Sequence, residues 1–427
     1  MEHDFNEAVE LLKKGQPPGN REVLQEISIG IDTLVSFITN HYFKDYISSG
    51  GSKIKFITGK PGSGKTHFLQ MLTLAASDQD FVPVHISAKE IWLHDFKEIY
   101  TEVFRQTNLT ACLELCAANI AAELGHEFSS IPSDMTFADY LSSLGELDVL
   151  TKKEIRNQLR VMFLQNPVLD NNFAIACSLL TGGILGHPAL EESNKALLLS
   201  WLSGSKEAKL PALRSLGMSP ARVTKFNARH MLRSLLEVLK MAGLPGVIVM
   251  VDNMEVLVNA SSLDVVRYTK MRRDDAYWNI RELIDDIDTL NNIMFFFAFD
   301  RLLLDDERTG LKSYHALWLR MQNEIVSSRF NKFTDIYDVD KYGADVYDKS
   351  TLAEMSKRFA DVMRKAGDEV EPIDELIAEE LISDARYTNI SLPRQVVIAT
   401  LEKKDDRQDP FGGVEVSLEE LKLYERF

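Results

Sequence analysis

The sequence predicts an α/β fold built on a parallel sheet, with a large helical insertion and a helical C-terminal lid. Short apolar runs are separated by stretches with helical spacing, which is the alternation expected when strands run parallel. A glycine-rich stretch, "GKPGSGKT", follows the first of these runs and precedes a helical pattern. A glycine-rich turn between the first strand and its helix is typical of doubly wound sheets that bind phosphate groups.

Five strands are expected along the chain. The run "KIKFIT" over 53–58 leads directly into the glycine-rich stretch. The other strands are predicted over 81–87, 247–251, 292–299 and 333–339. Helical spacing covers 5–14, about 31–47, the stretch after the glycines, most of 88–240, and the chain from Ser350 onward.

The spacing of the strands also predicts how the chain divides into domains. Lys65 in the glycine-rich stretch and Asp252 after the third strand are 252 − 65 = 187 residues apart, far more than a βαβ unit needs. We therefore expect an insertion between them. The predicted parts are an N-terminal helical lead-in (1–50), a P-loop α/β core (51–104 and 241–340), a helical insertion (105–240), a helical lid (341–402) and a C-terminal tail (403–427).

Composition excludes some classes of protein. The chain has 427 residues, 48 of them basic and 64 acidic, and its net charge of −16 argues against coating of nucleic acid, although a local basic patch remains compatible with it. No signal sequence or membrane span is visible, so we expect a cytoplasmic protein. Three cysteines make no disulfide scaffold. Cys112 and Cys116 suggest half a metal site or ordinary helix packing, and we favour packing.

The glycine-rich stretch matches the phosphate-loop pattern GxxxxGK[ST] at Gly59, Gly64, Lys65 and Thr66. Glycines let the backbone turn its N–H groups around a phosphate, the lysine places a positive charge against the β- and γ-phosphate oxygens, and the threonine hydroxyl binds Mg²⁺. The alternative is a glycine-rich turn without a ligand. The remaining candidates for nucleotide contact in and beside the loop are Pro61, Gly62, Ser63 and His67.

Asp252 follows five consecutive apolar residues, Val247 to Val251. A carboxylate at the end of a buried parallel strand is typical of the aspartate that helps hold Mg²⁺ beside a phosphate loop. The alternative is a residue that only ends the strand. We expect ATP and Mg²⁺ as the cofactors, with Thr66 and Asp252 as the residues of the metal site.

Several segments resemble one family in their order along the chain. They include "GGSKIKFITGKPGSGKTHFLQML", "AGLPGVIVMVDNMEVL", "RRDDAYWNIRELIDDID", "DDERTGLKSYHALWLRM" and "SLPRQVV". The chain resembles the P-loop ATP-binding proteins of BREX-type and related bacterial phage-defence systems, a branch of the AAA+ group near the origin-recognition and STAND ATPases. The resemblance implies an AAA+-like ATPase fold and an antiviral role with other defence-system proteins.

The resemblance also implies roles for residues far from the loop. A polar residue that ends the fourth strand senses the γ-phosphate in AAA+ proteins, and Asp300 with Arg301 occupies that place. An arginine of a late helix reaches the nucleotide of a neighbouring subunit, with Arg320 and Arg329 as candidates or as ordinary surface charges. Arg394, in "LPR", resembles the second sensor, which contacts the γ-phosphate from the lid.

Asn253 departs from the family pattern, because relatives usually carry glutamate there to polarise the attacking water. Asparagine can hydrogen-bond a water molecule but cannot take its proton at neutral pH. Either Glu255 supplies the carboxylate, if the strand ends early and the chain turns, or the site hydrolyses ATP slowly and works as a switch. We favour the switch.

Two further patterns can each be interpreted as functional or as ordinary structure. Arg267, Lys270, Arg272 and Arg273 form a basic cluster that contacts DNA or an acidic partner, or is a solvated loop, which we favour. The run Phe295–Phe297 suggests base stacking or a buried central strand, which we favour. Our main hypothesis is an ATP-controlled subunit that assembles with itself or other defence proteins, touches DNA only indirectly and is not bound to a membrane. The alternatives are a DNA-remodelling motor and a P-loop kinase.

Overall fold

The computed structural model describes residues 2–132, 134–260, 266–322, 329–385 and 388–402. The predicted tail, 403–427, lies outside the described residues. The chain forms two compact units, which are described separately. Unit 1 comprises Met1–Asp32, Lys60–His67 and Asp340–Phe427, and unit 2 comprises Thr33–Gly59 and Phe68–Val339.

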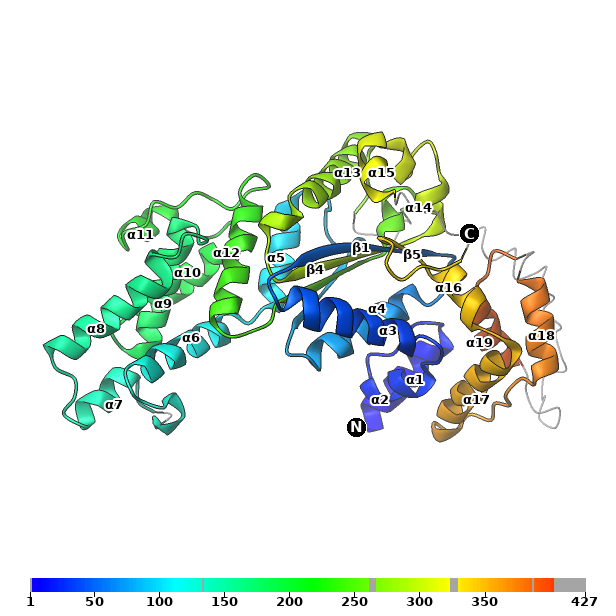
Figure 1. Cartoon of the computed structure of the whole chain (residues 1–427), viewed down its shortest axis with the longest axis horizontal. Coiled ribbons are helices and arrows are strands. Elements are labelled where there is room, and N and C mark those ends of the chain that lie inside the picture. The colour runs from blue at the N-terminus through cyan, green and yellow to red at the C-terminus, as the bar shows by residue number, and fades with distance from the viewer. Residues whose placement is uncertain (1, 133, 261–265, 323–328, 386–387, 403–427) are drawn as a thin grey trace. The chain divides into compact units, whose positions relative to one another are not determined.

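Unit 2 contains a parallel sheet of five strands (Figure 1), as predicted. The strands are β1 (Ser52–Gly59), β2 (Val82–Ser87), β3 (Val247–Asp252), β4 (Ile293–Asp300) and β5 (Ile336–Asp338), in the order β2-β3-β4-β1-β5. β4 is central, and Phe295, Phe296 and Phe297 are buried in it, which confirms the buried-strand interpretation of the phenylalanine run. Gly59 pairs with Asp300 at the carboxyl ends of β1 and β4.

β5 is shorter than the predicted 333–339. Its three residues pair with Phe56, Ile57 and Thr58 of β1. The residues before it form a turn, in which the Phe333 N–H donates to Asn331 Oδ1 at 3.0 Å and the Thr334 N–H donates to the Asn331 carbonyl oxygen at 3.3 Å. The buried Lys55 Nζ donates to the carbonyl oxygens of Phe333, at 3.2 Å, and Thr334, at 2.5 Å. The turn therefore occupies positions where the strand was predicted.

Helices cover both faces of the sheet. Figure 1 shows α3 (Asp32–Phe37) and α4 (Lys65–Ser77) on one side of the sheet and α13 (Lys270–Asp285), α14 (Arg301–Asp305) and α15 (His315–Met321) on the other. The helix expected over 31–47 continues from α3 as the π-helical segment η1 (Ile38–Ile47). The wider π turn lets Ile38, Tyr42, Phe43 and Ile47 all face the interior.

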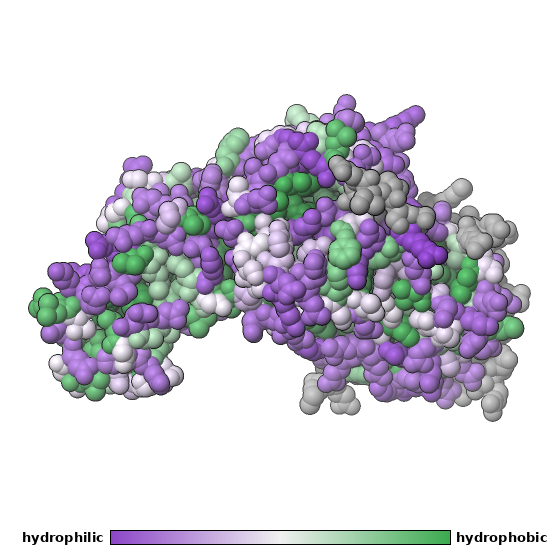
Figure 2. All heavy atoms as spheres, viewed as in Figure 1, coloured by the Kyte–Doolittle hydropathy of each residue, from purple (hydrophilic) through white to green (hydrophobic). Residues whose placement is uncertain are grey.

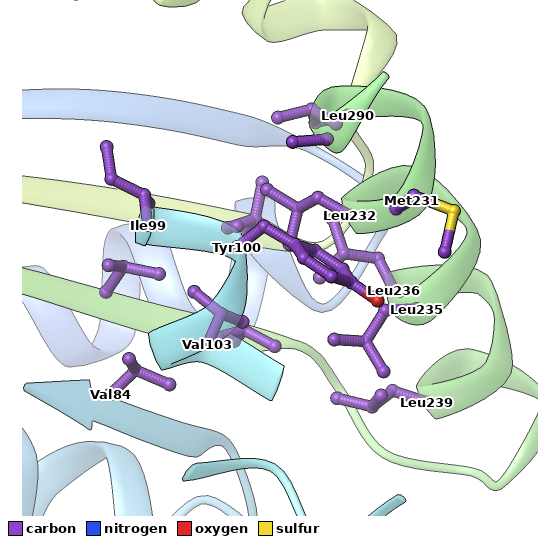
Figure 3. Packing of buried hydrophobic residues seen from close by; sticks show 14 of the residues in the cluster. Val84, Ile99, Tyr100, Val103, Met231, Leu232, Leu235, Leu236, Leu239 and Leu290 are labelled. Atoms are coloured by element: carbon purple, nitrogen blue, oxygen red, sulfur yellow. The ribbon is translucent and has the colours of Figure 1, made fainter. Parts of the chain in front are cut away.

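The chain between β2 and β3 is helical, in keeping with the helical spacing over most of 88–240. The first and last helices of this stretch are α5 (Phe96–Gln106) and α12 (Ala228–Met241). Between them in the sequence come α6 (Leu109–Glu123), α7 (Phe137–Ser143), α8 (Val149–Leu159), η3 (Arg160–Leu164), α9 (Asn171–Leu185), α10 (Glu192–Leu202) and α11 (Leu210–Arg214). Figure 3 shows the ring of Tyr100 from α5 among leucines of α12. The Tyr100 hydroxyl donates to the carbonyl oxygen of Leu202, which ties α5 to the end of α10.

Cys112 and Cys116 lie in α6 and Cys177 lies in α9, and all three are buried free cysteines. Burial raises the pKa of the Cys112 thiol to about 11 and that of the Cys116 thiol to about 12. No group of three metal-ligating side chains occurs among the described residues. All three cysteines pack in the hydrophobic core of unit 2, as the favoured interpretation expects.

Unit 1 joins the two ends of the chain. It contains α1 (Glu2–Lys13), α2 (Arg21–Ile27), α16 (Val339–Val346), α17 (Lys349–Lys365), α18 (Glu375–Asp384) and α19 (Leu392–Glu402). Ala8, Val9, Leu12 and Val23 pack with Phe359, Val362 and Met363 in one core. In the described parts of the chain, none of the helices is long and apolar enough to cross a membrane.

Candidate nucleotide-binding site

The loop between β1 and α4 has the backbone that the phosphate-loop pattern requires. Gly62 and Gly64 adopt left-handed conformations, with φ of 76° and 88°, which glycine enters without steric cost. Nothing lies within 4 Å of the position that a Cβ of Gly64 would take, so the loop is open on that side. α4 begins at Lys65, and its N-terminal N–H groups therefore face the loop.

One buried polar group of the loop forms no hydrogen bond with the described residues. Among the described residues, the buried Ser63 Oγ has no hydrogen-bond partner, and buried hydroxyls are normally satisfied. The Lys65 side chain folds back over the loop, where its Nζ donates to the carbonyl oxygen of Lys60 at 3.0 Å. An open cradle, an orphaned hydroxyl and a lysine held over the loop fit a phosphate group.

Arg394 of α19 packs directly against this loop. A Cβ built on Gly62 would lie 2.5 Å from Arg394 Cδ and 2.7 Å from Arg394 Cβ, closer than real atoms approach. Only glycine at position 62 leaves room for the arginine. The structure thus brings together two of the predicted site residues that are more than 300 residues apart in the sequence.

Lys60 fastens the loop to the helices of unit 1. Its backbone N–H donates to Asp340 Oδ2 at 2.8 Å, and its Nζ donates to the carbonyl oxygen of Thr388 at 2.8 Å. Gln395, next to Arg394 on α19, donates to Thr388 Oγ1 at 2.7 Å. The loop and the start of α19 are therefore held by the same short segment. The sequence analysis missed Lys60, because the phosphate-loop pattern leaves that position open.

His67, in the first turn of α4, carries no charge at neutral pH. Its Nε2 lies 2.8 Å from Ser28 Oγ, and the Ser28 carbonyl oxygen accepts a hydrogen bond from Arg358 Nη1 at 2.8 Å. Burial lowers the pKa of His67 to about 4, so the imidazole is neutral at pH 7. The positive charge beside the loop at neutral pH therefore comes from lysines and Arg394. Pro61 and Thr66 are exposed on the loop and on the first turn of α4.

In unit 2, a sharp turn follows β3. The strand ends at Asp252, and Asn253 adopts a left-handed conformation with φ of 62° and ψ of 34°. A 3₁₀ turn, η4 (Met254–Leu257), follows directly. The turn directs Glu255 to the end of β4, where the backbone N–H of Asp300 donates to Glu255 Oε2 at 3.4 Å. Gly59, Asp252 and Asp300 all end parallel strands and so lie at one edge of the sheet.

The candidate arginines of unit 2 have different surroundings. Arg301 Nη2 forms an ion pair with Asp338 Oδ2 at the end of β5. Arg320 Nε forms one with Asp285 Oδ1 at 2.6 Å, and that hydrogen bond raises the pKa of Arg320. Arg329 is exposed at the start of the segment that leads to β5. The roles expected of these arginines stay predictions.

A family model described as BREX system ATP-binding protein BrxC/D matches residues 2–397. The chain belongs to this family. The match spans the phosphate loop, the turn after β3 and Arg394, and it confirms the resemblance that the ordered motifs carried. Searches of curated proteins and of solved structures gave no match.

Membership of the BREX ATP-binding family indicates ATP as the ligand and places the chain within a defence system. The family description names no residue, so the roles at the loop, at Asp252 and at Arg394 rest on chemistry and geometry. ATP suits the loop because its phosphates accept hydrogen bonds from inward-facing backbone N–H groups and from Lys65.

Proposed function

We propose that the chain is an ATP-binding, AAA+-like P-loop subunit of a bacterial anti-phage defence complex, in which ATP acts as a conformational or assembly switch. The observation that carries this proposal is the packing of Arg394 on Gly62. An arginine held against a phosphate loop responds to the phosphates bound there, because a guanidinium forms strong charge-assisted hydrogen bonds with phosphate oxygens.

The predicted domains acquire functions in this proposal. The α/β core (51–104 and 241–340) binds nucleotide, and the lid (341–402) carries Arg394. Residues 59–66, with His67 behind them, hold the phosphates. A magnesium ion held through Thr66 and Asp252 would neutralise phosphate charge. The lead-in (1–50) supports the loop through Ser28 and His67.

The switch operates through differential binding. ATP and ADP differ by the γ-phosphate, so only ATP offers a third phosphate group to Arg394 and Lys65. A ligand shifts a conformational equilibrium only by its difference in affinity for the two states. The link from Lys60 to Asp340 and Thr388 gives that difference a route to the helices of unit 1.

Slow hydrolysis belongs to the same proposal, because Asn253 cannot accept a proton from water. A second candidate function is a faster ATPase in which Glu255 is the base. The observation that favours this second function is the left-handed turn at Asn253, which directs the Glu255 carboxylate toward the end of β4. The protein would then hydrolyse ATP either by itself or when a partner stimulates it.

ATP titration by calorimetry tests the binding proposal. Lys65→Ala should remove most of the affinity for Mg-ATP, since the loop loses the ammonium group held over it. Arg394→Ala should weaken ATP more than ADP, because only ATP has the γ-phosphate that the arginine is proposed to contact. Lys357→Ala and Arg364→Ala, on the surface of α17 in the same unit, are matched controls and should leave both affinities unchanged. Equal affinity of wild type and Lys65→Ala for ATP would refute the assignment of the loop.

A further inference from the structure

The connection between α10 and α12 carries a concentrated positive charge. Residues 206–225 include five basic side chains and one acidic one, Glu207, in a chain whose net charge is −16. The five are Lys206, Lys209, Arg214, Arg222 and Lys225, and all are exposed. None of the five forms an ion pair with another described residue. This charge is therefore not neutralised by the protein itself.

An exposed aromatic ring lies at the end of the same connection. Phe226 is 82 % exposed, although burying such a side chain normally stabilises a protein by about 2 kcal/mol. Lys225 Nζ lies 5.4 Å from the centroid of the Phe226 ring. An exposed phenylalanine beside a cation offers a base a flat face for stacking and offers the adjoining phosphate a charge.

One hydrogen bond brings two of these basic residues together. Arg222 Nη1 donates to the carbonyl oxygen of Lys206 at 2.7 Å, so these residues, 16 positions apart in the sequence, are neighbours in space.

We propose that this surface, called here the basic connection (Lys206, Lys209, Arg214, Arg222, Lys225 and Phe226), binds single-stranded nucleic acid. Its cations pair with backbone phosphates, and Phe226 stacks on a base. A single strand suits the surface better than a duplex, because stacked base pairs hide the faces that Phe226 would contact. The acidic remainder of the chain repels phosphate, so binding is confined to the basic connection.

Fluorescence anisotropy with labelled oligothymidine, oligouridine RNA and duplex DNA tests this proposal in the full-length protein without nucleotide. The two single strands should bind more tightly than the duplex, and their relative affinity shows whether DNA or RNA is preferred. Binding should weaken with salt. Phe226→Ala should weaken it roughly 5- to 100-fold, as expected for the loss of one stacked base. Lys209→Glu and Lys225→Glu should each weaken binding and reduce its salt dependence.

Two controls separate this proposal from its rivals. Lys44→Glu reverses the charge of another exposed lysine, on η1, and should leave nucleic-acid affinity unchanged. Lys65→Ala should also bind the oligonucleotides as wild type does, because the proposal does not depend on ATP binding. Absence of oligonucleotide binding would overturn the proposal and leave an acidic protein partner as the better occupant. Binding unaffected by Phe226→Ala and Lys225→Glu, or binding that favours the duplex, would overturn it too.

Discussion

Asn253 determines where the carboxylate after β3 points. A left-handed conformation is costly for most residues, about 1–2 kcal/mol, but asparagine tolerates it because its short side chain hydrogen-bonds locally. The backbone therefore turns at Asn253, and Glu255 comes within 3.4 Å of the Asp300 N–H. A glutamate at position 253 would be the usual base but would fit this turn poorly.

ATP turnover of variants at these two positions distinguishes a switch from an ordinary ATPase. If Asn253 leaves the site without a base, the wild type hydrolyses ATP slowly, since loss of a positioned base costs roughly 10²–10⁴ in rate. Glu255→Gln should then change turnover little, and Asn253→Glu should raise it if the turn survives.

The control for these variants is Asn253→Gly, which keeps the turn and removes the amide. It should leave turnover close to wild type if position 253 matters only through its backbone. Rapid wild-type turnover that Glu255→Gln abolishes, with ATP binding intact, would contradict the switch and make Glu255 the working base.

At the scale of elements, the contact between the phosphate loop and α19 can be tested without nucleotide. Gly62→Ala places a Cβ 2.5 Å from Arg394 Cδ in a backbone conformation that disfavours alanine, whereas Gly64→Ala incurs only the backbone cost. We expect Gly62→Ala to lower the thermal midpoint more than Gly64→Ala does. Arg394→Ala should remove part of that difference, because it deletes the nearest atom. Equal effects of the two glycine variants would show that Arg394 does not press on the loop in solution.

Lys55 fastens β1 to the segment before β5. Its Nζ lies 3.3 Å from Asp335 Oδ1 and 4.9 Å from the centroids of the Tyr42 and Tyr337 rings, and burial lowers its pKa to about 8. The unfolded chain keeps this proton up to about pH 10. Between pH 8 and 10 the unfolded state therefore holds more protons than the folded state, and the free energy of unfolding rises with pH.

Denaturant unfolding across that pH range checks this effect. Relative to Lys55→Met, the wild type should gain about 1 kcal/mol per pH unit above pH 8. Lys53→Met, on the same strand and partly exposed beside Asp335, is the matched control and should keep the slope. Burial raises the pKa of Tyr42 to about 12, so that hydroxyl has little influence below pH 10. Parallel curves for wild type and Lys55→Met would contradict the lowered pKa.

These elements show what the sequence could and could not predict. β3 and β4 lie within one residue of their predicted bounds because buried parallel strands are continuous apolar runs. The prediction made β5 too long, because the apolar spacing of 333–339 does not reveal the turn that Asn331 forms with Phe333 and Thr334. The left-handed turn at Asn253 could not be predicted, since asparagine tolerates that conformation but also adopts the ordinary ones, so the residue type alone does not select it.

For a related reason, some residues of the candidate site could be predicted from the sequence and others could not. The glycines and Lys65 form a local pattern, so the loop could be recognised from sequence. Lys60 and Ser28 act through distant partners and have no such pattern. The sequence contains the basic connection as a local excess of lysine and arginine, but the net charge of the whole chain, −16, does not reveal it. Net charge therefore has to be counted segment by segment in an acidic chain such as this one.

For the whole molecule, we predict that ATP promotes self-association. If an arginine of one subunit completes the nucleotide site of another, ATP should raise the molecular mass measured by light scattering. Arg320 would first have to leave Asp285, but an ion pair exposed to solvent contributes little to stability, so it is easily broken. Arg329 is exposed in the segment before β5.

Replacement of the working arginine by alanine should weaken ATP-linked assembly without weakening nucleotide binding by the monomer. Arg308→Ala, at another exposed arginine of unit 2, is the matched control and should assemble as wild type does. Loss of assembly in Arg320→Ala alone would identify Arg320, and loss in Arg329→Ala alone would identify Arg329. A protein that stays monomeric with ATP at every concentration would contradict self-association. The switch would then have to act on other proteins of the defence system, and the same arginine variants should be tested for ATP-dependent binding to those proteins.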